Sequence, residues 1–192
     1  MDYKNSLNFY PDFPIEGVTF VDVLPLLQDK DVFRSLTADL VKLCDSPNLI
    51  APEARGFLFA APMLYADGPV RTVLPVRKKG KLPHNPGDLV QVQIMKEYGP
   101  DNLYFRISDL RACVKEGDCI ELTFFDDILA TGGTAKGLAD SLNGQKLSID
   151  GKDFTLKVKD FVFLIEIDDL PGRACLEGIA PVKALIHVKE QE

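Results

Sequence analysis

The stretch CIELTFFDDILATGGTAKGL, residues 119–138, decides the fold that we predict for this chain. An apolar run over 120–125 predicts a buried strand, and two adjacent carboxylates, Asp126 and Asp127, follow it. Small residues over 130–134 then predict a tight loop. Open α/β sheets bind their ligands at the carboxyl ends of strands, where the two aspartates fall. The order therefore predicts an α/β unit with a binding site at its strand-to-helix turn.

The loop after the aspartates has the composition of a phosphate-binding cradle. Glycine lets a backbone approach a ligand closely, and threonine adds hydroxyl donors. A helix expected over 135–142 would direct its positive N-terminal end at the same anion. The loop lacks both the lysine of a triphosphate-binding GxxxxGK[ST] motif and the spacing of a dinucleotide-binding GxGxxG motif. We therefore expect a phosphorylated sugar here rather than a nucleoside triphosphate or a dinucleotide.

The residues expected to hold that sugar form two groups. Sugar hydroxyls are donors, and ionised carboxylates are acceptors, so the two aspartates are assigned to the ribose. Neighbouring strand residues point to opposite sides, so the aspartates are not expected to share one role, and one of them can assist proton movement. The 5-phosphate is assigned to Ala130, Thr131, Gly132, Gly133 and Thr134.

Composition limits the class of protein. A chain of 192 residues, 46% apolar and 27% charged, predicts one globular domain over 1–192. Its apolar runs are far shorter than the roughly 18 residues of a membrane span, and no signal peptide is evident. Four cysteines without metal-ligand spacing predict reduced thiols and a cytoplasmic protein. The net charge of −7 argues against nucleic-acid binding, whereas the basic cluster over 77–81 suits a small polyanion.

Strand and helix patterns alternate along the chain, which predicts a mostly parallel central sheet flanked by helices. Strands are expected over 48–51, 73–76, 120–125, 161–167 and 182–188, and helices over 31–43, 54–65 and 135–142. Two alternating segments, 89–95 and 103–107, predict a hairpin that turns at 98–101. Turn dipeptides near 143 and 150 predict a small β insertion over about 144–158, before the strand at 161.

The DDILATGGT pattern resembles the phosphoribosyl-pyrophosphate (PRPP) signature of the type I phosphoribosyltransferases. Four further segments resemble the adenine phosphoribosyltransferases, in that family's order: PDFPIEGVTFVDVLPLLQD at 11–29, EARGFLFAAP at 53–62, VRKKGKLP at 76–83 and KEYG at 96–99. The resemblance implies a type I phosphoribosyltransferase-like fold with a base-binding segment over 10–29 and a β flap, or hood, over about 78–106. It also implies purine salvage, in which adenine and PRPP give AMP and pyrophosphate. Mg²⁺ would be carried by PRPP and pyrophosphate rather than bound directly by the protein, and the enzyme would be a homodimer.

The same resemblance assigns roles to individual residues. Pyrophosphate would be bound by Arg55, Arg77, Lys78 and Lys81. The base would be bound by the backbone of Thr19, by stacking on Phe20 with Ile167 opposite, and by an edge contact from Arg55. At the end of the flap, Glu97 would relay a proton and Tyr98 would close over the reacting centre. The resemblance also implies that the peptide between Glu53 and Ala54, or a neighbouring one, can be cis. The alternative for Arg55 is an arginine in the first turn of a helix that pairs with Glu53.

Departures from the family pattern leave two alternatives. Val21 stands where the family often has a polar or basic residue, and the flap is about three residues longer than expected. These differences favour, as a first alternative, a phosphoribosyltransferase for another purine or related base. The second is a non-catalytic regulator that binds PRPP, which the acidic charge and the short segment before the first motif disfavour. His84 and His187 match no motif and are expected to be non-catalytic.

Overall fold

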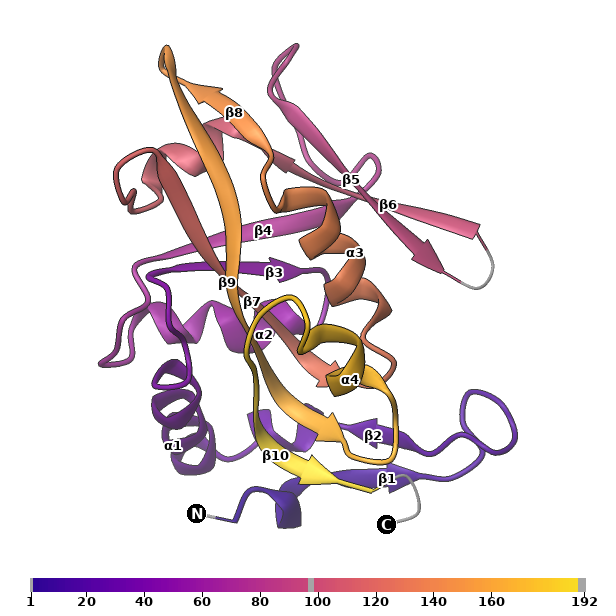
Figure 1. Ribbon diagram of the computed structural model, residues 1–192. Helices are drawn as coiled ribbons and strands as arrows, with labels where there is room; N and C mark the ends of the chain where they lie inside the picture. Colours follow the sequence, from indigo (N-terminus) through magenta and orange to yellow (C-terminus); the bar gives the residue numbers. More distant parts are fainter. Residues whose placement is uncertain (1, 97–98, 190–192) are drawn as a thin grey trace.

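The computed structural model describes residues 2–96 and 99–189, and Figure 1 shows how its elements are arranged. The strands are β1 (Asn8–Tyr10), β2 (Phe20–Asp22), β3 (Asn48–Pro52), β4 (Thr72–Lys78), β5 (Leu89–Lys96), β6 (Gly99–Arg106), β7 (Cys119–Leu129), β8 (Lys146–Ile149), β9 (Lys152–Ile167) and β10 (Val182–Val188). The α-helices are α1 (Lys30–Val41), α2 (Gly56–Ala60), α3 (Gly133–Leu142) and α4 (Gly172–Leu176). Short 3₁₀ turns are η1 (Lys4–Ser6), η2 (Leu24–Leu27), η3 (Pro62–Leu64) and η4 (Ile107–Ala112).

The central sheet confirms the predicted fold class. Its strand order is β10-β9-β7-β3-β4-β6-β5, and β8 pairs with β9. The five strands from β10 to β4 are parallel, whereas β6 and β5 form an antiparallel hairpin at one edge. A separate pair, β1 with β2, carries the N-terminal segment. The carboxyl ends of the parallel strands therefore meet at one edge of the sheet, where ligands of such sheets bind.

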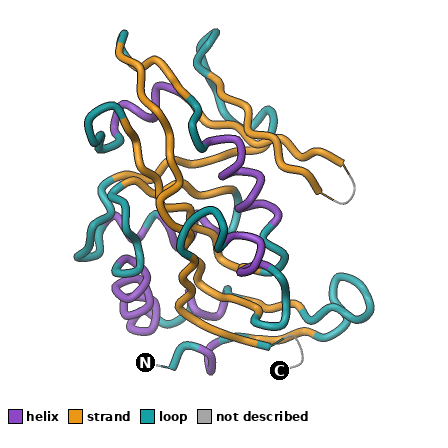
Figure 2. Tube along the Cα trace, in the orientation of Figure 1, coloured by secondary structure: helices purple, strands orange, loops and turns teal. Residues whose placement is uncertain are grey.

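Two hydrophobic clusters cover the two faces of this sheet. Phe124 belongs to the cluster that also holds side chains of α3, while its neighbour Phe125 belongs to the cluster that holds side chains of α1 and α2. Both rings are fully buried, because successive residues of a strand point to opposite faces. Figure 2 shows the long strands crossing the molecule with helical segments on either side of them. None of the described helices combines the length and apolar character needed to cross a bilayer.

Several predicted boundaries differ from the structure, three of them next to the predicted site. The strand predicted over 120–125 is longer, because β7 continues through both aspartates to Leu129. Helix α3 begins at Gly133 rather than at residue 135. The helix predicted over 54–65 is divided into α2 and η3, and the division falls at Pro62, which has no N–H to continue an α-helix.

The β insertion predicted over 144–158 is part of the central sheet. The buried strand predicted over 161–167 is present as the end of β9. It is not separate from the insertion, however, because β9 runs without interruption from Lys152 to Ile167 and forms a hairpin with β8. The first half of β9 pairs with the start of β7, between Cys119 and Leu122, and the register then shifts by one residue. The inserted residues therefore lengthen the sheet instead of leaving it.

The β5–β6 hairpin is the element predicted as the flap. β6 begins at Gly99, four residues earlier than predicted, and Gly99 pairs with Lys96. Glu97 and Tyr98 therefore join the two strands and lie outside the described residues. The hairpin packs on α3: a Cβ on Gly137 would lie 3.1 Å from the Cα of Ile94. Its inward side chains are buried, among them Val92, Ile94, Leu103 and Phe105.

Candidate active site

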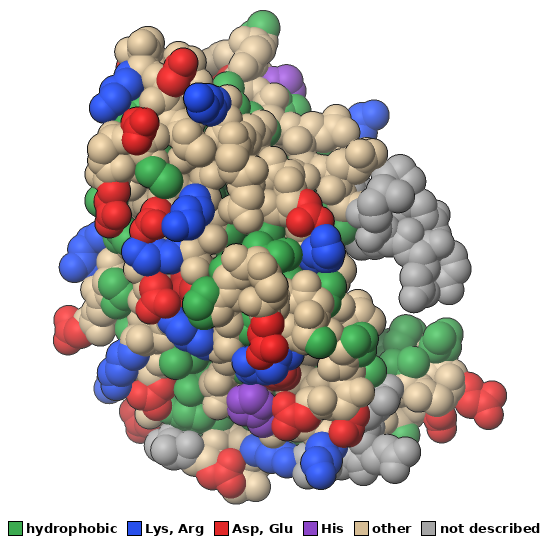
Figure 3. All heavy atoms as spheres, viewed as in Figure 1, with side chains coloured by type: hydrophobic (Ala, Val, Ile, Leu, Met, Phe, Trp, Pro, Cys, Tyr) green, Lys and Arg blue, Asp and Glu red, His purple; other side chains and the backbone are tan. Residues whose placement is uncertain are grey.

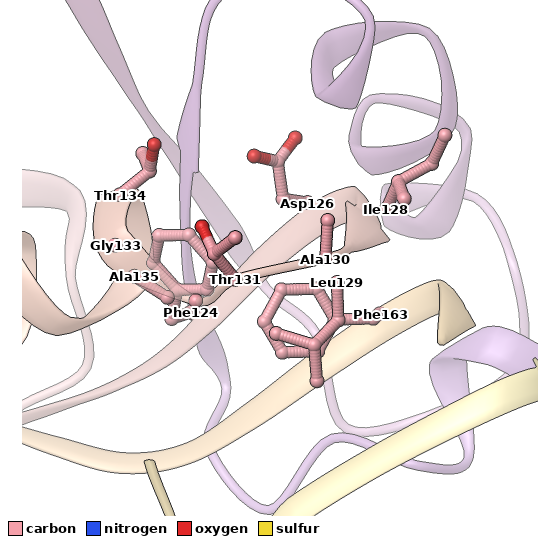
Figure 4. Close-up of a pocket in the computed structure, with 11 residues that line it drawn as sticks. Phe124, Asp126, Ile128, Leu129, Ala130, Thr131, Gly133, Thr134, Ala135 and Phe163 are labelled. Atoms are coloured by element: carbon pink, nitrogen blue, oxygen red, sulfur yellow. The ribbon is translucent and has the colours of Figure 1, made fainter. Parts of the chain in front are cut away.

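A small cavity lies at the carboxyl end of β7, where the sequence predicts the phosphate cradle. Its volume is about 120 Å³, and Figure 4 shows the side chains around it. The carboxylate of Asp126 and the hydroxyls of Thr131 and Thr134 project to the same side of the β7–α3 turn. Its walls are formed by Phe124, Asp126, Ile128, Leu129, Ala130, Thr131, Gly132, Gly133, Thr134, Ala135 and Phe163. The structure thus brings all five predicted phosphate residues together with one of the two aspartates.

The backbone of this loop is arranged to offer N–H groups to a ligand. Gly132 has φ +78°, a left-handed conformation that suits glycine, and it is the N-cap of α3 without any side-chain cap. The Lys136 N–H donates to the Gly132 carbonyl at 2.9 Å, while the N–H groups of the preceding turn have no acceptor within the helix. The positive end of the helix dipole adds to their field. An anion in the cavity would satisfy these donors.

Gly172, at the start of α4, is a functional neighbour that sequence reasoning missed. A Cβ on Gly132 would lie 3.0 Å from the Gly172 carbonyl oxygen, and a Cβ on Gly172 would lie 2.4 Å from the Ala130 carbonyl oxygen. Two glycines therefore allow α4 to pack directly on the cradle loop. The Pro171-Gly172 pair was the only local signal for this turn, and it does not reveal which loop the turn touches.

The two aspartates have different surroundings, as their alternation along β7 predicts. Asp126 lines the cavity, and its Oδ1 accepts the Asp127 N–H at 2.9 Å. Burial, together with the charge of Asp127, raises the pKa of Asp126 well above its usual value near 3.8. Asp127 has only 5% of its surface exposed and forms an ion pair, with its Oδ2 2.7 Å from Arg55 Nε. The two neighbours therefore have different surroundings: Asp126 faces the cavity, and Asp127 faces Arg55.

The Oδ2 atom of Asp127 is still able to accept a hydrogen bond. Its contact with Arg55 lacks hydrogen-bond geometry, and among the residues that the structure describes it is the one buried side-chain oxygen without a hydrogen-bond partner. Buried polar oxygens in folded proteins nearly always have a partner. A ligand hydroxyl could reach this oxygen only if Arg55 moved aside, because the atom is buried and does not line the cavity.

Arg55 connects the aspartates to the predicted base-binding segment. Its guanidinium lies 5.3 Å from the centre of the Phe20 ring while its Nε faces Asp127. The peptide between Glu53 and Ala54 is cis, as expected. The alternative pairing of Arg55 with Glu53 is wrong, because Glu53 forms an ion pair with Arg77 instead.

Gly56 sets how closely helix α2 approaches the carboxylates. A Cβ at this position would lie 2.9 Å from Asp126 Oδ1. Any larger residue would therefore push the helix start away from β7 or displace the Asp126 side chain. Close packing of α2 on β7 is what places Arg55 within reach of Asp127.

The predicted pyrophosphate residues lie in two places. Arg55 is part of segment 53–57. Arg77 contacts the same segment, because it pairs with Glu53 and lies 5.8 Å from the Phe57 ring centre. Lys78 ends β4 and lies beside a different hollow, of about 240 Å³, at the base of the hairpin. Lys81 follows in the same turn, where its N–H donates to the Lys78 carbonyl at 3.1 Å.

The N-terminal segment holds the predicted stacking residue in an aromatic setting. Phe20 begins β2, and the Phe13 ring meets it edge-on, with centres 5.2 Å apart. Sequence reasoning did not single out Phe13, although it lies within the family-like segment PDFP. An open groove of about 630 Å³ is lined by Tyr10, Pro11, Asp12, Phe13, Phe20, Asp22 and Leu24. Figure 3 shows hydrophobic side chains at the right-hand edge, where this loop projects in Figure 1, next to a hollow.

The remaining predicted base residues are placed as follows. Thr19 directly precedes β2 and is partly exposed. Ile167 is the last residue of β9 and is buried, with 8% of its surface exposed, in the hydrophobic cluster that also contains Val21. Glu97 and Tyr98, the predicted flap residues, lie outside the described residues, so their roles stay predictions.

A group of residues suitable for a metal lies elsewhere. Within the described part of the chain it is formed by Glu166, Asp168 and His187, whose ligand atoms lie within 4.8 Å of one another. Arg173 already occupies both carboxylate oxygens of Glu166, at 2.8 and 2.5 Å. His187 Nδ1 lies 2.7 Å from Asp168 Oδ1, which satisfies that pair as well. These contacts explain the group without a metal.

The chain is similar to curated proteins named adenine phosphoribosyltransferase. The chain is 37% identical to the adenine phosphoribosyltransferase of Clostridium tetani, over 97% of this chain and 98% of that protein. It is 35% identical to the adenine phosphoribosyltransferase of Acetivibrio thermocellus, over 93% and 95% of the two chains. No family model matches the chain.

Solved structures agree with the sequence comparison. The adenine phosphoribosyltransferase of Thermoanaerobacter pseudethanolicus superposes with a TM-score of 0.73 at 33% identity, covering 97% of this chain and 98% of that one. The enzyme of Saccharomyces cerevisiae, crystallised with adenine and an imino-altritol bisphosphate, gives a TM-score of 0.69 at 30% identity, with 94% of each chain covered. The likeness extends over almost the whole of each chain.

Proposed function

The chain belongs to the adenine phosphoribosyltransferase family, and we propose that it joins adenine to PRPP, with release of pyrophosphate, in purine salvage. In this reaction the bond from C1 of the ribose to pyrophosphate breaks, a bond from C1 to a purine nitrogen forms, and that nitrogen loses its proton. The observation that carries the proposal is the cradle at the end of β7, which joins a phosphate-sized cavity to Asp126 and, through Asp127 and Arg55, to Phe20. A phosphate, a sugar and a base lie in that order in the product.

The cradle and the aspartates hold the phosphoribosyl group. The free N–H groups around Gly132 and Gly133 and the hydroxyls of Thr131 and Thr134 bind the 5-phosphate. The ribose hydroxyls donate to the carboxylates, of which Asp126 lines the cavity. Asp126, whose pKa is raised, is the better placed of the two to take part in proton movement.

The basic residues stabilise the leaving group. Arg55, Arg77, Lys78 and Lys81 neutralise the charge that develops on pyrophosphate as the bond breaks. Asp126 is the one carboxylate among the described residues that line the cradle, so a hard cation there would take most of its oxygen ligands from the substrate. We propose that Mg²⁺ is carried by PRPP and pyrophosphate, where it would neutralise phosphate oxygens.

The base is bound by the N-terminal segment and the end of β9. Adenine stacks on Phe20 with Ile167 on its other side, and the Thr19 backbone N–H donates to N1 of the base. Hypoxanthine and guanine carry a proton at N1, so this donor would disfavour them. Glu97 relays the proton of the attacking nitrogen, and Tyr98 closes the site over it.

One assay tests this function and its alternatives. Purified protein is mixed with PRPP, MgCl₂ and each of a panel of purines and related bases, and pyrophosphate release is measured. We expect turnover with adenine, little with hypoxanthine or guanine, and loss of turnover when EDTA removes Mg²⁺. Turnover with another base alone would favour the first alternative. PRPP binding without any turnover would favour the regulator.

The oligomeric state and location are also proposed. Lys78 lines a hollow separate from the cradle, and Lys81 follows in the same turn, which suits bases that reach the site of a second subunit. Leu58, Leu64 and Tyr65 expose 43%, 42% and 93% of their surface near α2 and offer apolar area to a partner. Light scattering is expected to give the mass of a homodimer. The four cysteines are all free thiols, which supports a cytoplasmic location.

A further inference from the structure

Arg55, in segment EARGF (residues 53–57), and Arg77, which that segment contacts, are held in the same way. Arg55 directs its Nε to the carboxylate of Asp127 and lies over the ring of Phe20, 5.3 Å from its centre. Arg77 directs its Nε to the carboxylate of Glu53 and lies over the ring of Phe57, 5.8 Å from its centre. Each guanidinium therefore has an anion at one edge and an aromatic face beneath it.

The anchor of Arg77 is itself rigidly held. The Glu53 N–H donates to the Val76 carbonyl at 2.9 Å, which ties the start of the segment to β4. The Glu53 side chain is 12% exposed, and the Arg77 side chain is 35% exposed. Phe57 lies in the first turn of α2, directly after the Gly56 that packs against Asp126. The carboxylate of Glu53 thus extends from a backbone tied to β4, and the ring of Phe57 from a helix start packed against Asp126.

This anchoring leaves one edge of Arg77 available. A guanidinium has five N–H donors, and the bond to Glu53 uses the one on Nε. Across residues 2–96 and 99–189, no hydrogen bond from the terminal nitrogens of Arg77 to the protein is present. Those nitrogens form the fork that binds phosphate oxygens in pairs. Stacking on Phe57 fixes the plane of that fork.

We infer that Glu53 and Phe57 are positioning residues, which hold the Arg77 fork in the orientation that binds the diphosphate of PRPP. The inference rests on the proposed role of Arg77 in pyrophosphate binding. A side chain that is ordered before the ligand arrives loses less conformational freedom on binding. Glu53 is an anion, and its charge alone would repel pyrophosphate. Removing Glu53 should therefore tighten pyrophosphate binding if only charge matters, and weaken it if Glu53 positions Arg77.

The test is a double-mutant cycle read by magnesium pyrophosphate binding in calorimetry. We expect Arg77→Gln to weaken binding by about tenfold or more, and Glu53→Gln and Phe57→Leu by about three- to tenfold each. In the Arg77→Gln background, Glu53→Gln is expected to cause no further weakening and to tighten binding slightly, because only the repulsion by Glu53 is then removed. Steady-state kinetics should show KM for PRPP rising in each variant, while KM for adenine stays within about twofold.

The control is a matched ion pair away from the site. Arg106 Nε lies 2.9 Å from Asp109 at η4, so Asp109→Asn removes an arginine anchor of the same kind. It should leave pyrophosphate affinity unchanged. Thermal unfolding of all variants shows whether each is folded. If Glu53→Gln does not fold, the double-mutant cycle is measured with Phe57→Leu in its place, alone and combined with Arg77→Gln.

The outcomes separate the inference from the function on which it rests. If Arg77→Gln binds pyrophosphate as tightly as the unaltered protein, the proposed role of Arg77 is wrong, and the inference is overturned with it. If Arg77→Gln weakens binding but Glu53→Gln leaves it unchanged or tightens it, only the inference is overturned. Independent, multiplying effects of the two changes would also overturn it, because Glu53 would then act without Arg77.

Discussion

The cradle and the β5–β6 hairpin both adjoin helix α3, but different interactions shape them. The cradle is continuous in sequence: its phosphate residues follow one another between β7 and α3. The hairpin is positioned by a residue far away in the sequence, since Ile94 packs against Gly137 of the helix that begins at the cradle. Local chemistry therefore shapes the first region, whereas long-range packing shapes the second.

The strongest way to break the cradle is to remove its carboxylates. Asp126→Asn with Asp127→Asn should lower pyrophosphate release by about three orders of magnitude or more, because the ribose loses both ionised acceptors and Arg55 loses its partner. Circular dichroism should show an intact fold. Asp140→Asn, which removes an exposed carboxylate farther along α3, should stay within about twofold. Near-normal activity of the double variant would contradict the site.

A backbone change in the cradle tests whether its geometry matters beyond its side chains. Gly132→Ala places a Cβ 3.0 Å from the Gly172 carbonyl oxygen at a left-handed residue. We expect kcat/KM for PRPP to fall by about a hundredfold, since small displacements of a binding loop misplace the reacting atoms. The rate of pyrophosphate release, measured with adenine at varied PRPP concentrations, gives this kcat/KM.

Gly144→Ala is the matched control for that change. Gly144 has the same kind of backbone, with φ +81°, but a Cβ there would meet nothing within 4 Å. Both variants should lose on the order of 1–2 kcal/mol of stability from the left-handed conformation, seen as a lower Tm. Only Gly132→Ala should lose activity. Equal activity losses would show that stability, and not cradle geometry, is being measured.

The hairpin side of the comparison is tested at Gly137. Alanine there favours α3 by up to about 1 kcal/mol through helix propensity, but its Cβ would lie 3.1 Å from the Ile94 Cα. We expect Tm to change little while kcat falls by about three- to tenfold, because β5 must shift relative to the cradle. Pyrophosphate affinity should be unchanged. Gly178→Ala, where a Cβ meets nothing within 4 Å, should leave kcat unaltered; an equal loss there would rule out a specific effect of the hairpin.

The same contrast explains what could be predicted from the sequence. Every cradle residue was found because a phosphate-binding loop needs small residues and hydroxyls within a few consecutive positions. Arg77 was found, but its partners Glu53 and Phe57 were not, because β3 and β4 must first pair before these residues meet. Gly172 and Phe13 were missed for the same reason. The continuous β9 was missed because turn signals locate a hairpin but not the strand with which it pairs.

The smallest expected effect concerns stability rather than activity, and it lies in Asp126. Burial raises the pKa of this carboxyl in the folded protein, so the folded state holds its proton more tightly than the unfolded chain does. As the pH rises from near 4, the unfolded chain ionises first, and the free energy of unfolding falls until the pH passes the raised pKa. Asp126→Asn removes this loss, so we expect Tm at pH 7 to rise by a few degrees, and the dependence of Tm on pH in the acid range to become flatter. Asp140→Asn, at an exposed position, should change neither the Tm at pH 7 nor the dependence of Tm on pH. Calorimetry between pH 4 and 8 measures both quantities. A lower Tm for Asp126→Asn at pH 7 would show that the buried carboxylate stabilises the empty site; a higher one would show that the cradle keeps a destabilising group because the ribose requires it.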